Sequence, residues 1–217
     1  MIQTGTEIGA APVEGISCKF RTTADIHAHP ITLETVLSDQ LSDGNQVLWL
    51  QFKTTEEADG IFLPPRLRLF LAQEHASAAN LLMLLGTQLK SIRLLDAHGQ
   101  SVVLSPKVHF PAFDEPLLPY PDNAFPAFGW LQELLFFPQK FLFFEIADIS
   151  KGRNTLKGDK FRIEFVFYKS AVPLPTLSAR DFAMNVAPVV NLFEHEAEPI
   201  NLTHETSEYL VLPSGAH

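Results

Sequence analysis

His27 and His29, followed by Glu34, form the pattern with the clearest chemical meaning in this chain of 217 residues. Two histidines that are two residues apart on a strand project their imidazoles to the same face. A carboxylate further along the chain can complete a ligand set of the kind that binds iron, manganese, nickel or zinc. The spacing therefore raises one hypothesis, a metal site built from His27, His29 and Glu34.

This spacing is similar to the first half of a cupin metal motif, and a cupin-like metal-binding protein or enzyme is our alternative function. The similarity ends there. Arg21 and Leu41 stand where the cupin pattern has glycines, and no glycine-rich turn precedes a third histidine. Pro30 follows His29 directly and disturbs the strand register. We therefore prefer histidines with a structural role, and we expect no metal and no cofactor.

The other reactive residues do not stand in catalytic patterns. The acidic and histidine run 194–196 would point to opposite faces of a strand, so we interpret it as a solvated loop. Cys18 is the single cysteine and has no local histidine partner. The sequence has no G-x-S-x-G elbow, no P-loop and no G-x-G-x-x-G motif. We expect a protein that is not an enzyme. A sugar-binding β-sandwich ranks last, because Trp49 and Trp130 lie in an apolar strand and at a helix start.

Composition and charge narrow the classes of partner. Hydrophobic residues make up 46% of the chain and charged residues 19%, which supports a sizeable core. The net charge is −9, and it argues against nucleic acid and membrane surfaces as partners. The longest apolar runs are far shorter than the ~18 residues of a membrane helix. One cysteine and the lack of a signal-like start predict a cytoplasmic location.

Hydrophobic periodicity predicts a mainly β (α+β) fold with antiparallel, sandwich-like or barrel-like sheets. The predicted strands are 17–22, 31–37, 46–53, 66–72, 89–95, 101–104, 141–146, 161–168, 183–193, 199–202 and 207–212. Apolar side chains on both faces of 46–53 indicate a central strand. Helical spacing predicts two short helices at 77–88 and 128–137, the first with Ser77 as its N-cap and the second ending at Pro138.

A proline-rich stretch suggests how the chain is divided. Residues 111–126 contain five prolines, which exclude a helix or a central strand there. We expect a flexible lead-in at 1–16, a β-rich lobe with one short helix at 17–112, and a second such lobe at 113–217. One compact domain is the alternative.

Asn191, Leu192 and Phe193 are the candidate residues for binding a partner. The segment 187–193 has apolar side chains on both faces and is followed by acidic residues. Such a strand is either central in a sheet or an edge that something else covers. The residue types favour a buried strand end. The other reading is an exposed anchor, since a minority of the eighteen phenylalanines could contact another protein.

Four collinear blocks of residues carry a family resemblance. The blocks are Phe20-Arg21-Thr22 with 30–33, then 67–71 with 79–82, then 131–133 with 136–145, and finally 185–193 with 197–200 and 207–209. Together they look like the signature of TssF, also called ImpG or VasA, the large baseplate subunit of the bacterial type VI secretion system. TssF proteins are longer, so the chain resembles an internal portion of them.

The resemblance implies a structural role. TssF proteins pair with themselves and with TssG in baseplate wedges, which attach to TssK around the spike. From the resemblance we expect a β-rich subunit that acts through protein–protein contacts, with TssG-like and TssK-like partners. It also implies a place in the bacterial cytoplasm, docked to an inner-membrane complex through other subunits. No catalytic residue is carried over.

Overall fold

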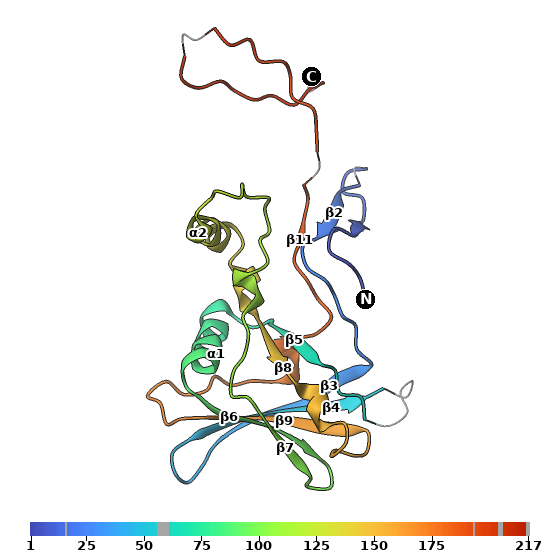
Figure 1. Cartoon of the computed structure of the whole chain (residues 1–217), viewed down its shortest axis with the longest axis vertical. Helices are drawn as coiled ribbons and strands as arrows, with labels where there is room; N and C mark the ends of the chain where they lie inside the picture. Colours follow the sequence, from blue (N-terminus) through green and yellow to red (C-terminus); the bar gives the residue numbers. More distant parts are fainter. Residues whose placement is uncertain (16, 56–60, 193, 204–205, 216–217) are drawn as a thin grey trace.

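The computed structural model describes residues 1–15, 17–55, 61–192, 194–203 and 206–215. The molecule is elongated, with a broad antiparallel sheet at one end and an extended C-terminal segment at the other (Figure 1). Smaller sheets and the helices lie between them. Over the described ranges, the mainly β, antiparallel fold with two α-helices that the sequence predicts is confirmed.

The broad sheet has five antiparallel strands among the described residues, in the order β3-β4-β9-β6-β7. They are β3 (Ile31–Gln40), β4 (Gln46–Thr54), β9 (Lys160–Phe167), β6 (Leu89–Asp96) and β7 (Ser101–Leu104). Alternate side chains of the two central strands are fully buried on the inner face: Leu48, Leu50, Phe52, Phe161, Ile163, Phe165 and Phe167. The prediction of a central strand at 46–53 is confirmed, because β4 lies between β3 and β9.

The outer face of this sheet carries a cross-strand polar cluster. Glu164 on β9 lies opposite Trp49 on β4 and Arg93 on β6. Its carboxylate accepts hydrogen bonds from Trp49 Nε1 at 2.9 Å and from Arg93 Nε at 2.8 Å. Trp49 therefore has a role within the sheet.

A smaller sheet covers the inner face of the broad one. Its order is β10-β5-β8, with β10 (Phe182–Ala183), β5 (Arg66–Leu71) and β8 (Phe143–Ala147). Helix α1 (His75–Thr87) lies beside β5 and β8 on the same side (Figure 1). The apolar core lies between these elements and the broad sheet, and it includes Leu67, Leu69, Leu71, Leu81, Leu84, Phe144 and Ile146.

The helix ends show two corrections. Ser77 is not the N-cap of α1: the carboxylate of Glu74 accepts hydrogen bonds from the backbone N–H groups of Ala76 at 3.0 Å and Ser77 at 3.1 Å. The helix therefore begins two residues before Ser77. Helix α2 (Pro126–Phe136) ends before Pro138, as predicted, but it begins two residues before the predicted start, with proline at its first position. The short 3₁₀ turns in the described ranges are η1 (Pro111–Phe113), η2 (Pro138–Leu142), η3 (Ile149–Gly152) and η4 (Ala179–Asp181).

A third small sheet involves the two ends of the chain. It has the order β1-β2-β11, with β1 (Glu7–Gly9), β2 (Lys19–Thr22) and β11 (Val189–Val190). The segment predicted as a flexible lead-in, 1–16, thus contains a paired strand. Ile2 N also donates a hydrogen bond to the carbonyl of Ile26 at 2.9 Å.

The strands predicted at 199–202 and 207–212 are wrong, and the one predicted at 183–193 is reduced to the two-residue strands β10 and β11. In the described part of the C-terminal segment, the backbone pairing includes an isolated bridge between Ala197 and Pro213, with hydrogen bonds from Glu198 N to the carbonyl of Leu212 and from Ser214 N to the carbonyl of Glu196. Prolines at 199 and 213 have no N–H to donate to a ladder.

Strands from both sides of the proline-rich stretch occur in each of the three sheets that the structure describes. β9 lies between β4 and β6, and β8 pairs with β5. The division into lobes 17–112 and 113–217 stays a prediction about folding units. The pairing across it favours the alternative of one compact domain.

Candidate functional site

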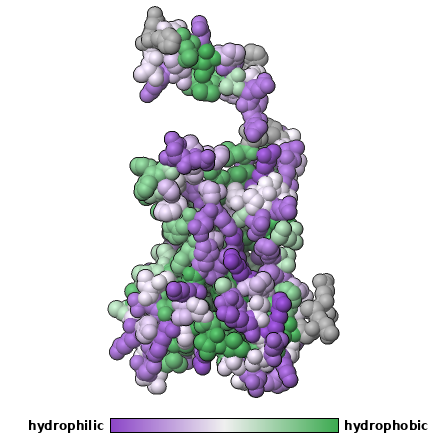
Figure 2. All heavy atoms as spheres, viewed as in Figure 1, coloured by the Kyte–Doolittle hydropathy of each residue, from purple (hydrophilic) through white to green (hydrophobic). Residues whose placement is uncertain are grey.

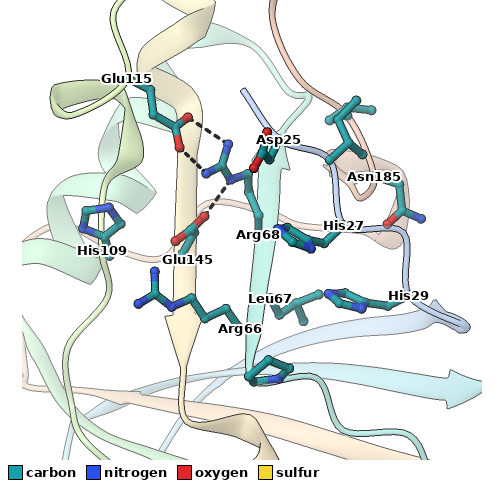
Figure 3. Close-up of a pocket in the computed structure, with 13 residues that line it drawn as sticks. Asp25, His27, His29, Arg66, Leu67, Arg68, His109, Glu115, Glu145 and Asn185 are labelled. Carbon is teal, nitrogen blue, oxygen red and sulfur yellow. Dashed lines mark hydrogen bonds and ion pairs between the residues drawn. The ribbon is translucent and has the colours of Figure 1, made fainter. Parts of the chain in front are cut away.

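The two histidines of the predicted metal pattern line a pocket of about 450 Å³ beside β5. Figure 3 shows His27 and His29 approaching β5 from one side, with His109 and Glu115 on the other side. The segment between β2 and β3 supplies the histidines, and the residues that precede α2 supply His109 and Glu115. β8 adds Glu145 and the segment after β10 adds Asn185 and Val186, so the pocket lies where five parts of the chain meet.

An arginine with two carboxylates forms the polar centre of this pocket. Arg68 Nε donates to Glu145 Oε1 at 2.7 Å, from β5 to the residue opposite on β8. Its two terminal nitrogens donate to the two oxygens of Glu115 at 2.9 and 2.6 Å (Figure 3). Burial alone would lower the pKa of Arg68, but the bonds to both carboxylates outweigh it and raise the pKa. Arg68 thus links the smaller sheet to the segment before α2.

The structure does not bring the three predicted metal ligands together. The rings of His27 and His29 are stacked with centroids 6.4 Å apart. Glu34 does not line their pocket, and its carboxylate binds Lys160 Nζ at 2.8 Å. In the described ranges, no group of three or more His, Cys, Asp or Glu side chains could hold a metal ion. Burial, and then the neighbouring His27, lowers the pKa of His29, which favours a neutral ring.

Asn191 and Leu192 lie just after β11, beside a hollow of about 380 Å³. The other side of this hollow includes Cys18, Lys19 and Arg21, from β2 and the residue before it. Leu192 is 46% exposed, so it is not a buried strand end. Phe193, the third residue of the predicted site, lies outside the described residues.

Helix α2 is the most exposed apolar element that the structure shows. Figure 2 shows hydrophobic residues, in green, gathered where Figure 1 places α2. Eight large apolar side chains on the helix and at its two ends are exposed: Phe125, Phe128, Trp130, Leu131, Leu134, Leu135, Phe136 and Phe137. A helix this rich in apolar side chains is normally buried, so its exposure is unusual.

A buried ion pair fixes the inner face of α2. Glu133 is 2% exposed and Lys140 on η2 is 3% exposed, and the two form an ion pair. The other carboxylate oxygen of Glu133 accepts a hydrogen bond from Leu117 N at 2.7 Å. Gly129 is buried one turn earlier, and a Cβ there would lie 3.0 Å from the ring of Tyr120. The preceding loop can therefore pack closely on α2 only because residue 129 is glycine.

Sequence reasoning predicted α2 but did not recognise its exposure. A signal was present, because the helical segment has a single charged residue, Glu133, and apolar residues at almost every other position. Such a pattern fits a buried helix as well as a contact helix, and the sequence alone does not separate the two. The ion pair with Lys140 was also missed, because a spacing of seven residues across a helix end follows no local rule.

The comparisons with known proteins point to one family. The family model "Type VI secretion system, TssF" matches residues 1–217. A stretch of 100 residues is 27% identical to the type VI secretion system component TssF1 of Pseudomonas aeruginosa, covering 46% of this chain and 16% of that protein. The fold matches a chain of the TssK-TssF-TssG baseplate subcomplex, solved by cryo-electron microscopy, with a TM-score of 0.78 and 26% identity.

The structural match covers 99% of this chain and 42% of that chain. The chain therefore spans less than half the length of the relatives it matches. Among the described residues, no helix combines the length and the apolar character needed to cross a bilayer. The family match, the sequence relative and the fold agree, and the chain belongs to the TssF family of type VI secretion system proteins.

Proposed function

We propose that this chain is a structural part of a type VI secretion baseplate and acts through protein–protein contacts. The observation that supports this most strongly is the fold match along nearly the whole chain to a protein solved within the TssK-TssF-TssG subcomplex. The exposed apolar helix α2 agrees with it, because a surface of this kind is stable in water only when another protein covers part of it.

The proposed partners are a TssG-like subunit, a TssK-like subunit and a second TssF-like copy. The assembly would lie in the bacterial cytoplasm and reach an inner-membrane complex through other subunits. The role needs no chemistry from the chain itself. The pocket at Arg68 fits this view, because its ion pairs connect elements of the fold.

Asn191 and Leu192 are the proposed contact residues near the end of the chain. They follow the edge strand β11, and Leu192 is exposed beside a hollow that a partner's side chain could enter. The role of Phe193 in the same contact stays a prediction.

Co-expression tests the proposed function. The full chain would be produced with the TssG-like and TssK-like subunits of the same bacterium, and a tag on a partner would be used for purification. We expect co-elution on size exclusion at a mass well above the 24.2 kDa of the chain alone. A folded, monodisperse chain that elutes alone in the presence of every one of these subunits would overturn the proposal.

A further inference from the structure

We infer that α2 is the docking surface for an apolar helix of a different baseplate subunit, an inference that rests on the proposed function. The centre of the surface is the ridge formed by Phe128, Leu131 and Leu135. These side chains are 72%, 57% and 82% exposed. Their spacing places them on the side of the helix opposite Gly129 and Glu133, the face that the loop covers.

The exposed area is large enough for a stable contact. The eight exposed side chains of α2 and its ends present roughly 900 Å² if a fully exposed large side chain counts about 200 Å². A standard interface buries about 800 Å² on each partner. The largest apolar patches on ordinary monomers reach about 300–600 Å². The surface therefore exceeds what a monomer usually exposes and matches one side of an interface.

The geometry of the surface selects a helix as the occupant. The backbone groups of α2 are already bonded within the helix, so a strand could not add to it as it adds to a sheet edge. A ridge of residues spaced by three and four packs into the grooves of another helix. A cavity of about 210 Å³ lies on the opposite side of α2, where Tyr120, Gly129 and Glu133 line it, so the ridge itself is the surface offered to the partner helix.

Charge selects a different subunit over a second copy. Residues 108–139 contain no lysine or arginine, and Asp114 and Asp122 in this stretch are exposed. Two copies docked through α2 would bring these acidic residues, and two chains of net charge −9, close together with no basic group to pair them. A partner helix with an apolar stripe and basic flanks has the complementary charge.

Substitutions on the ridge test the inference in the full chain, co-expressed with the TssG-like and TssK-like subunits. Leu131→Glu and Leu135→Glu are expected to weaken partner binding by about thirtyfold or more, the loss typical of a central anchor. Leu135→Gln is a milder test at the same position, because glutamine is polar but carries no charge. Met83→Glu is the matched control, because Met83 is an exposed apolar residue of the other helix. We expect all four variants to have the melting temperature of the wild type, since each substitution changes an exposed side chain.

A photo-crosslinking residue at position 135 identifies the occupant. We expect a crosslink to a helical segment of another subunit that carries Leu or Phe and basic neighbours. Crosslinks to a second copy, or to another part of the same protein, would overturn the inference, and so would folded ridge variants that bind like the wild type. In those cases the wild type still co-purifies and the proposed function stands. If the wild type itself binds no subunit, the proposed function fails and this inference fails with it.

Discussion

Removing one partner of the buried Glu133–Lys140 pair is expected to destabilise the chain strongly. Glu133→Ala leaves the ammonium of Lys140 buried without its carboxylate partner, 5.5 Å from the ring of Phe141. The same change removes the acceptor of the Leu117 amide. An uncompensated buried charge costs about 3–5 kcal/mol of unfolding free energy, so we expect a loss at the upper end of this range.

Lys140→Met is expected to cost less than Glu133→Ala. Methionine keeps most of the apolar stem, and the Glu133 carboxylate retains the hydrogen bond from Leu117 N. The double variant Glu133→Gln/Lys140→Met keeps that acceptor and removes both charges. It should be more stable than the sum of the single changes predicts, with a coupling of at least about 2 kcal/mol.

Urea denaturation followed by tryptophan fluorescence measures these changes. Trp130 lies one turn before Glu133 on α2 and reports local unfolding, while Trp49 on β4 reports the broad sheet. Trp49→Phe and Trp130→Phe backgrounds separate the two signals. Breaking a buried ion pair normally lowers the free energy of unfolding by several kcal/mol. A loss below about 1 kcal/mol for Glu133→Ala, together with additive effects of the two single substitutions, would refute the claim that this pair holds α2.

Four further results are expected. Arg68→Met should lower the free energy of unfolding by about 2–3 kcal/mol, and Arg68→Lys should restore only part of it because lysine cannot bond both carboxylates in a fork. The lowered pKa of His29 means that the unfolded chain binds more protons just below pH 6.5, so the urea midpoint should fall as pH falls from there, and His29→Gln should flatten this slope. Leu192→Asp should weaken binding to a baseplate partner in a pull-down, while Leu41→Asp, at similar exposure, should not. Residues 17–112 produced alone should show no cooperative thermal transition, because β9 is missing from between β4 and β6.

The elements that the sequence predicts well are those in which local pattern and burial agree. β4 and β9 alternate apolar residues along their whole length, and both are central strands. α2 ends before Pro138 as predicted, since proline disrupts a helix interior, although it begins two residues before the predicted start, at Pro126. In these cases the backbone preference and the tertiary contacts favour the same structure.

The failures occur where distant parts of the chain decide the outcome. Arg68 binds Glu115 and Glu145, which are 47 and 77 residues away in sequence. No spacing rule predicts such contacts. The segments at 199–202 and 207–212 alternate like strands, but a strand needs a neighbouring edge to satisfy its backbone groups. In the described fold the isolated bridge nearby, Ala197–Pro213, lies outside both segments. The alternation correctly predicted an extended backbone, but it also predicted strands that these segments do not form in the described structure.

The polar contacts around α2 explain how an apolar helix can be both fixed and exposed. Glu133 links α2 to the loop before it and to η2, and η2 leads directly into β8. Arg68 on β5 binds both Glu145 on β8 and Glu115 in that loop. The loop, η2 and the smaller sheet are therefore connected to one another by ion pairs. A helix held by ordinary core packing would have to bury its apolar ridge against its own chain. We infer that the buried ion pair, together with the contacts of Tyr120 with Gly129 and of Trp130 with Phe113, fixes the orientation of α2 from one side and leaves Phe128, Leu131 and Leu135 exposed for another protein.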